Sequence, residues 1–161
     1  MHGRFPHLSY PRRYRKEDIA ITEQVMEQLG IAHMAQKQLA TLSGGERQRA
    51  YIAMLLAQNS DIICMDEPTT YLDISHQLEI METLNSLKQK GKTLVVILHD
   101  LNLAMRYADQ IFVMESGNML YDGNVDSLYN RGLIDEIFGV TTQQIETKMG
   151  SQYCFIPRSH I

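Results

Sequence analysis

Residues 42–67 read LSGGERQRAYIAMLLAQNSDIICMDE and contain the two patterns that decide the fold. Ser43, with Glu46 three residues later, forms a capping box, which predicts a helix that begins at Ser43 with its first N–H groups pointing outward. The apolar run 62–65 does not alternate with polar residues, which predicts a strand covered on both faces. Asp66 and Glu67 follow at its end. The stretch therefore predicts a capped helix followed by a buried strand.

Downstream, the pattern predicts a second strand parallel to the first. Residues 93–98 are an apolar, β-branched run that ends in His99 and Asp100. Leu78, Met81, Leu84 and Leu87 share one helical face between the two runs, and Gly91 ends that pattern. Strand, helix and strand of this length form a parallel βαβ unit. Because ligands bind at the carboxyl ends of parallel strands, we expect Asp66, Glu67 and His99 to share one site.

The remaining elements are expected on either side of this unit. Residues 1–16 mix glycine, prolines, aromatics and arginines, which is typical of a loop. An amphipathic pattern predicts a helix at about residues 18–29, ended by Gly30. Residues 111–114 and 119–121 form a hairpin pattern, two short helices are expected around Gly132, and the last residues are weakly patterned. Three parts follow: about 1–58 helical, about 59–123 with the parallel strands, and about 124–161 with C-terminal helices and a tail.

Composition excludes several classes of protein. The chain has 161 residues, 44% of them hydrophobic, and a formal net charge of -4. The locally basic run 12–16 is best read as a solvated loop, so no nucleic-acid partner is expected. Cys64 and Cys154 are far apart and Cys64 lies in an apolar run, where we expect a buried thiol and no disulfide framework. The histidines lack the i, i+4 spacing of a helical zinc site, and no apolar run could span a membrane.

The candidate site residues are weak evidence one by one. An Asp-Glu pair after an apolar run is usually a solvated turn, and a single histidine is usually a satisfied loop residue. Ser43, Gly44 and Gly45 change this balance, because glycines at a capped helix N-terminus let backbone N–H groups approach an anion. The capped glycine pair, the Asp-Glu strand end and the histidine strand end, in this order along the chain, indicate a site that binds phosphate.

These residues resemble the nucleotide-binding domains of ATP-binding cassette (ABC) transporters, over essentially the whole chain. Residues 42–46 are similar to the family's signature motif, residues 62–67 to its Walker B strand, residues 70–73 to its D-loop, and His99 to its switch histidine. The resemblance implies an α/β, P-loop NTPase-like core with parallel strands and a helical subdomain. Two departures are Glu46, where glutamine is usual, and Tyr71, where a small residue is frequent.

The resemblance also implies a cofactor, Mg²⁺, a nucleotide, ATP, and a role for each residue. Asp66 would hold Mg²⁺, usually through water, since a hard cation prefers carboxylate oxygen. Glu67 would act as the general base on the attacking water. His99 would donate to the γ-phosphate and sense it. The other cofactor-binding residues belong to two motifs. The signature residues Ser43, Gly44, Gly45 and Glu46 would bind ATP held by the opposite subunit. Asp73 of the D-loop would lie at the dimer interface.

Residues 3–6 and 99–104 look most like importers of the iron-siderophore, haem and cobalamin type. The partners expected are a second ATPase subunit in a head-to-tail dimer, membrane permease subunits and, indirectly, a substrate-binding protein. The expected location is the cytoplasmic face of the cell membrane, as a peripheral protein. The permease and the binding protein, rather than these residues, would choose the substrate.

One expected motif is missing from the sequence. The phosphate-loop pattern, Gly followed by four residues and Gly-Lys-Ser/Thr, occurs nowhere in it. In the family that loop lies upstream of residues 3–6, so we expect an N-terminal portion to be missing, the chain by itself to be inactive, and residues 93–98 to form an edge strand. Two other functions are considered. The first is a non-catalytic fragment that offers its signature helix to another subunit, and the second is a soluble ABC ATPase outside transport.

Overall fold

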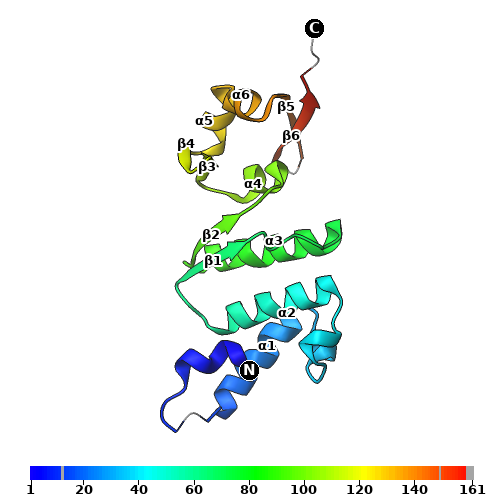
Figure 1. The fold of residues 1–161 in the computed structure, drawn as a ribbon, viewed down its shortest axis with the longest axis vertical. Helices are drawn as coiled ribbons and strands as arrows, with labels where there is room; N and C mark the ends of the chain where they lie inside the picture. Colours follow the sequence, from blue (N-terminus) through cyan, green and yellow to red (C-terminus); the bar gives the residue numbers. More distant parts are fainter. Residues whose placement is uncertain (12, 149, 159–161) are drawn as a thin grey trace. The chain divides into compact units, whose positions relative to one another are not determined.

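The computed structural model describes residues 1–11, 13–148 and 150–158 (Figure 1). Within it the chain forms two compact units, residues 1–98 and residues 99–161. Both units mix helices and strands, as the sequence predicts. The three-part division near residues 58 and 123 stays a prediction. No helix among the described residues has the length and apolar character needed to cross a membrane.

The first part of unit 1 is helical. It contains η1 (His2–His7), α1 (Lys16–Gln28), η2 (Ala32–Met34), η3 (Leu39–Thr41) and α2 (Gly44–Ala57). α1 packs against α2, and the apolar side chains between the helical segments are buried, Ile31 to 1% exposure. The helix predicted at about 18–29 is confirmed with an earlier start. The helix predicted from Ser43 is confirmed with Ser43 as its N-cap.

The prediction of a loop for residues 1–16 was wrong for residues 2–7, which form η1 on the last turn of α2. A Cβ added to Gly3 would collide with the carbonyl oxygen of Met54, so the two backbones are in close contact. Arg4 is 8% exposed; its Nε donates to Asp18 Oδ1 at 2.9 Å, and its Nη1 donates to the Ala57 carbonyl at 3.2 Å. The buried Arg4–Asp18 ion pair and the close contact of Gly3 with α2 therefore stabilise η1, although the composition of this segment is typical of a loop.

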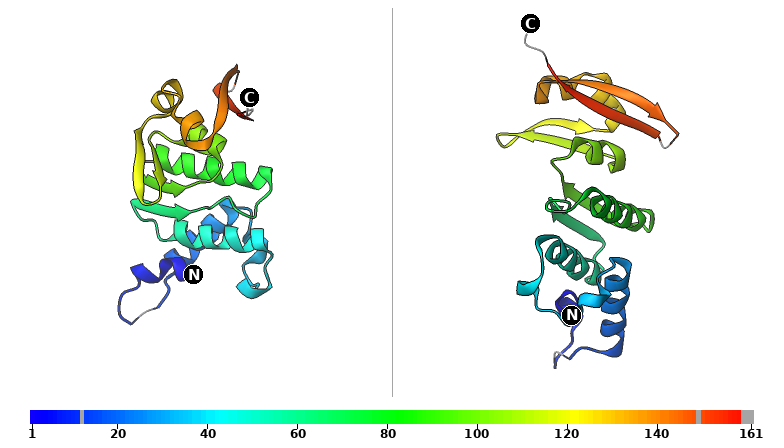
Figure 2. Two further views of the ribbon diagram at one scale, coloured as in Figure 1. Left: turned by 45° about the horizontal axis from the view of Figure 1, so that its top comes forward. Right: turned by 90° about the vertical axis from the view of Figure 1, so that its right-hand side faces the viewer.

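The second part of unit 1 is the predicted βαβ unit. β1 (Ile62–Asp66) and β2 (Thr93–Ile97) pair in parallel, and α3 (Ile74–Gln89) connects them (Figure 2). Asp66 is in register with Ile97, so the carboxyl ends of both strands lie at one edge. Among the described residues β2 pairs with β1 alone. The parallel pair and its connecting helix are confirmed.

The expectation that both faces of these strands are covered was wrong for the described residues. Burial alternates along each strand: Ile63 is 3% exposed, whereas Ile62, Val95 and Ile97 are 63%, 52% and 57% exposed. Cys64 is on the exposed side, contrary to the expected buried thiol. The reason is that α3 packs against this strand pair, and the residues pointing to the other face have no comparable layer in the described part of the chain.

Unit 2 has its own apolar core. Its elements are α4 (Leu101–Tyr107), β3 (Ile111–Glu115), β4 (Asn118–Gly123), α5 (Val125–Asn130), α6 (Leu133–Phe138), β5 (Val140–Thr147) and β6 (Gly150–Pro157). Met105, Tyr121, Leu128, Ile134 and Tyr153 form the buried cluster. The predicted β3–β4 hairpin and the helices on either side of Gly132 are confirmed.

The β5–β6 hairpin of unit 2 was not predicted from the sequence. Its first strand is polar on both faces, so it lacks the alternation typical of a strand. Side chains of neighbouring helices satisfy its outer N–H groups: Thr142 N donates to Asp135 Oδ1 at 2.8 Å, and Gln144 N donates to the Tyr129 hydroxyl at 3.3 Å. These tertiary hydrogen bonds, together with pairing to β6, hold a strand that periodicity does not reveal.

Candidate functional site

The N-terminus of α2 is built as the capping box predicts. Ser43 N donates to Glu46 Oε2 at 2.8 Å, and Glu46 N donates to Ser43 Oγ at 3.3 Å. The two groups satisfy each other, and the N–H groups of Gly44 and Gly45 lie in the first turn, where a helix has no internal acceptors for them. The result is a helix end whose partial positive charge and small residues suit an anion.

Glu46 places a carboxylate beside this helix end. The Ser43 N–H that donates to it lowers the pKa of Glu46 below the usual 4.5, and the Ser43 hydroxyl and Lys37 act in the same direction. Lys37 Nζ lies 3.6 Å from Glu46 Oε1. The negative charge of Glu46 is therefore stabilised by the N-cap residue Ser43 and by Lys37.

Residues 67–73, named here the 67–73 loop, lie next to the two glycines. A Cβ added to Gly45 would be 3.2 Å from Leu72 Cδ2, and one added to Gly44 would be 3.9 Å from the Tyr71 Cβ. Gln48 on α2 also donates from Nε2 to the Pro68 carbonyl at 3.2 Å. The structure thus brings the residues similar to the signature motif and to the D-loop together within unit 1.

The carboxyl end of β1 carries the two predicted acidic residues. Asp66 is exposed and lines an open pocket of about 300 Å³ with residues of α2 and Pro68. Glu67 is half-buried and has a φ of 47°, a conformation uncommon for a residue with a side chain. Its N–H donates to the Ile97 carbonyl at 3.0 Å, and its Oε2 accepts a hydrogen bond from the Thr70 hydroxyl at 2.9 Å. Both residues lie at the carboxyl end of β1, and the hydrogen bond from Thr70 orders the carboxylate of Glu67.

Asp73 has a local structural role that the sequence analysis did not predict. It is the N-cap of α3 and accepts hydrogen bonds from the His76 N–H at 3.0 Å and the Ser75 hydroxyl at 2.8 Å. The His76 backbone N–H and the Ser75 hydroxyl hold the pKa of Asp73 far below its usual value, and the His76 ring adds to this effect. Its expected place at a dimer interface stays a prediction.

His99 belongs to unit 2, immediately before Asp100, the N-cap of α4. Asp100 Oδ1 accepts from the N–H groups of Asn102 and Leu103, which fixes the backbone after His99. Because His99 and Glu67 belong to different units, their expected pairing at one site stays a prediction.

The sequence reasoning did not predict the hydrogen bonds of three side chains that order the 67–73 loop. These are Thr70, Gln48 and Gln77, the last donating from Nε2 to the carbonyls of Thr69 and Leu72 at 3.3 and 3.1 Å. Only Thr70 had a local signal, since it lies three residues after Glu67. Gln48 bonds a backbone carbonyl twenty residues away, and Gln77 bonds carbonyls five and eight residues before it, none of which belongs to a recognised local pattern.

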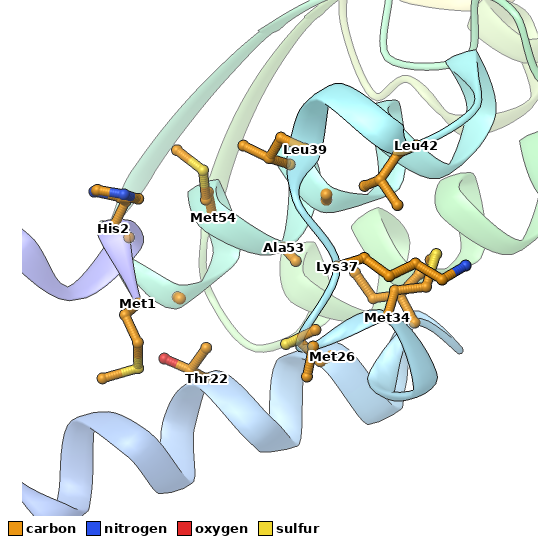
Figure 3. Close-up of a pocket in the computed structure, with 15 residues that line it drawn as sticks. Met1, His2, Thr22, Met26, Met34, Lys37, Leu39, Leu42, Ala53 and Met54 are labelled. Carbon is orange, nitrogen blue, oxygen red and sulfur yellow. The ribbon is translucent and has the colours of Figure 1, made fainter.

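Two features bear on possible ligands. Among residues 1–11, 13–148 and 150–158, no group of three or more His, Cys, Asp or Glu side chains is arranged to hold a metal ion. A pocket of about 290 Å³ lies among η1, α1, η2 and α2, and four methionines line it: Met1, Met26, Met34 and Met54 (Figure 3). That pocket includes none of the predicted site residues.

The geometry agrees with comparisons to known proteins. The model of the ABC transporter family matches residues 3–70. The ferric enterobactin transport ATP-binding protein FepC of Escherichia coli (strain K12) is 42% identical over 156 residues, covering 96% of this chain and 58% of FepC. The petrobactin import ATP-binding protein FpuC of Bacillus anthracis is 39% identical over 160 residues, covering 99% of this chain and 58% of FpuC. The chain therefore spans less than two thirds of the length of these relatives.

Solved structures share the fold. An inward-facing metal-chelate type ABC transporter matches with a TM-score of 0.82 and 26% identity, covering 97% of this chain and 64% of that one. A dimeric, post-hydrolysis state of the ATP-binding cassette MJ0796, bound to ADP and Pi, matches with a TM-score of 0.65 and 30% identity. The match covers 72% of this chain and 51% of the MJ0796 chain. The shared fold is that of an ATP-binding cassette of the P-loop NTPase class. The chain belongs to the ABC transporter family, and the relatives FepC and FpuC are ATP-binding proteins of that family.

Proposed function

We propose that this chain is part of an ATP-hydrolysing subunit of an importer for iron-siderophore or related metal chelates. The observation that carries the proposal is the contact between the capped, glycine-lined N-terminus of α2 and the 67–73 loop, which begins with Glu67. The similarity to FepC and FpuC, named for ferric enterobactin transport and petrobactin import, supports the substrate class.

The reaction proposed is transfer of the γ-phosphoryl group of ATP to water. The water oxygen forms a bond to the γ-phosphorus, the bond from that phosphorus to the β–γ bridging oxygen breaks, and ADP and inorganic phosphate are released. Because this transition state is loose, catalysis consists mainly of positioning and charge stabilisation. The carboxylate of Glu67 would orient the water and accept its proton.

The donor set at the strand end fits Mg²⁺. This ion prefers oxygen ligands and usually binds through one or two carboxylates together with substrate phosphates, whose charge it neutralises when bound. Asp66 offers one exposed carboxylate beside an open pocket. Since the described residues form no cluster of three such ligands, Asp66 would hold the ion together with the nucleotide.

The N-terminus of α2 would act on a nucleotide held by a second copy of the subunit. Ser43, Gly44 and Gly45 would bind its γ-phosphate, and Glu46 would keep the cap closed. The dimeric MJ0796 cassette with ADP and Pi supports an arrangement of two subunits. Asp73 would lie along the interface between them, and His99 would donate to the γ-phosphate.

The assembly proposed extends beyond the ATPase. ATP hydrolysis would energise transport through the permease subunits of the importer, and a substrate-binding protein would deliver the chelate. The ATPase subunit would lie on the cytoplasmic face of the membrane. Residues 1–161 contain no phosphate-loop pattern, and we propose that they do not hydrolyse ATP by themselves.

The substitution Gly45→Asp in the whole protein tests the role of α2. A carboxylate at this helix end repels a phosphate, and the added Cβ would meet Leu72 Cδ2 at 3.2 Å. We expect ATP turnover to fall at least about 100-fold while each monomer binds ATP with unchanged affinity, because the site serves only the partner's nucleotide. Turnover and nucleotide affinity measured on the same preparation check this.

Gly30→Asp is the matched control. Gly30 follows α1 with a φ of 66° and open space around it, and aspartate tolerates this backbone conformation better than most residues. Turnover by Gly30→Asp should match the unsubstituted protein. Loss of ATP binding by the Gly45→Asp monomer would count against a site used in trans, and full turnover would refute a role of this helix end.

A further inference from the structure

The carboxylate of Glu67 is attached to a rigid piece of backbone. Its N–H donates to the Ile97 carbonyl at 3.0 Å, which extends the β1–β2 pairing by one residue, and its carbonyl accepts from Thr70 N at 3.2 Å. Pro68 and Thr69 are buried, Thr69 to 7% exposure. The Cα of Glu67 is therefore fixed from both sides, and only the side-chain torsions remain to be set.

The Thr70 hydroxyl sets those torsions. It donates to Glu67 Oε2 at 2.9 Å across the four-residue turn 67–70, and the backbone hydrogen bond from Thr70 N to the Glu67 carbonyl closes the same turn. A glutamate side chain has several rotamers, and ordering it costs free energy at the moment of reaction unless the fold has already ordered it. A hydroxyl that donates to one carboxylate oxygen provides that order.

We propose that Thr70 is a positioning residue for the carboxylate of Glu67. The inference rests on the proposed function, in which Glu67 accepts the proton of the attacking water. Thr70 touches neither water nor phosphate in this role. It holds the carboxylate at the end of β1 in the orientation that hydrolysis needs, and its methyl group is not required.

Glu67 also has the strained backbone that such a site tolerates. A non-glycine residue at a φ of 47° costs free energy and persists only where neighbouring contacts enforce it. The bonds to Ile97 and Thr70 enforce it here. An uncommon backbone conformation and a hydrogen bond to the carboxylate thus occur together at Glu67.

The test compares Thr70→Val and Thr70→Ser in the whole protein. Valine keeps the shape and removes the donor, whereas serine keeps the donor and removes the methyl group. We expect Thr70→Val to lower kcat about 10-fold or more with little change in KM for ATP, because a hydrogen bond to a charged group is lost without loss of ground-state binding. Thr70→Ser should stay within about 2-fold of the unsubstituted kcat.

Two further variants complete the design. Thr83→Val removes a hydroxyl that bonds the Glu79 carbonyl on α3, and it should leave kcat unchanged. Thr70→Val combined with Glu67→Gln should be no slower than Glu67→Gln alone, since both changes act through one carboxylate. Thermal unfolding of every variant separates a loss of positioning from a loss of fold.

The outcomes are distinct. A kcat of Thr70→Val equal to that of the unsubstituted protein overturns the proposal, as does an equal loss in Thr70→Val and Thr70→Ser with a lowered Tm, which is the behaviour of a structural residue. If Glu67→Gln itself keeps full kcat, the proposed function fails, and the role of Thr70 fails with it. If Glu67→Gln is inactive and Thr70→Val is normal, only the positioning role fails.

Discussion

At the scale of single residues, two pairs of acidic side chains in unit 1 have different roles. Asp18 and Asp73 accept hydrogen bonds from backbone N–H groups at the starts of α1 and α3, and their pKa values are lowered. Asp66 and Glu67 are instead at a strand end and are the residues proposed for chemistry. The same residue type thus caps helices in two places and serves the proposed reaction in a third.

Asp18 makes the stability of unit 1 depend on pH. The Arg15 N–H that donates to it is the main cause that lowers its pKa below the usual 3.8, followed by the Arg4 guanidinium. A carboxyl group with a lowered pKa in the folded state contributes stability that is present above its unfolded pKa and is lost as pH falls through the folded value. We therefore expect Tm to fall more steeply as the pH is lowered below 3.8 in the unsubstituted protein than in Asp18→Asn.

Thermal unfolding in a pH series measures this difference. Because the pKa values of Glu46 and Asp73 are lowered as well, the comparison with Asp18→Asn isolates the share of Asp18. Parallel Tm curves for the two proteins would mean that Asp18 gains nothing from its partners on folding.

At the scale of elements, η1 is attached to the C-terminal end of α2. Besides the Gly3 and Arg4 contacts, His7 Nε2 lies 2.6 Å from the Gln58 carbonyl. The last carbonyls of a helix lack internal partners, and cationic or donor groups stabilise them. Residues 2–7 therefore complete the end of α2 opposite to its glycines.

Gly3→Ala tests this attachment. The new Cβ would collide with the Met54 carbonyl oxygen and would lie 2.9 Å from Ala57 Cβ, so η1 or α2 must shift. We expect Tm to fall by roughly 3–10 °C, the range for overpacking by one methyl group in a protein of this size. Gly44→Ala is the control: its nearest neighbour is Tyr71 Cβ at 3.9 Å, and alanine favours a helix. An equal Tm for both variants would contradict the close contact of η1 with α2.

Elements with a local signal were predicted, and elements held by tertiary contacts were not. The capping box placed the start of α2, and the apolar runs placed β1 and β2, because each signal lies within a few residues. η1 depends on the Arg4–Asp18 pair, and β5 depends on Asp135 and Tyr129, and these contacts span 7 to 15 residues between different elements. Likewise the sequence predicted Asp66 and Glu67 as site residues, which stays a prediction, whereas the hydrogen bonds of Gln48 and Gln77 to the 67–73 loop were not predicted.

At the scale of the whole molecule, the described residues form two units that contribute different elements. Unit 1 contains the α2 N-terminus, the 67–73 loop and the β1 end. Unit 2 begins with His99 and contributes its own core. The exposed apolar side chains Ile62, Val95 and Ile97 show that periodicity predicted the strands correctly but not their covering in the described part of the chain.

The central claim is that Glu67 at the end of β1 is the general base of ATP hydrolysis, and steady-state ATP turnover by the whole protein carrying Glu67→Gln tests it most directly. Asp61→Asn is the control: this carboxylate precedes β1 at the opposite end, is almost fully exposed, and lies 3.0 Å from Lys92 Nζ. Loss of a general base typically costs ~10²–10⁴-fold in rate. We predict a loss of that size in Glu67→Gln and unchanged turnover in Asp61→Asn. Turnover by Glu67→Gln equal to that of the unsubstituted protein would contradict the account.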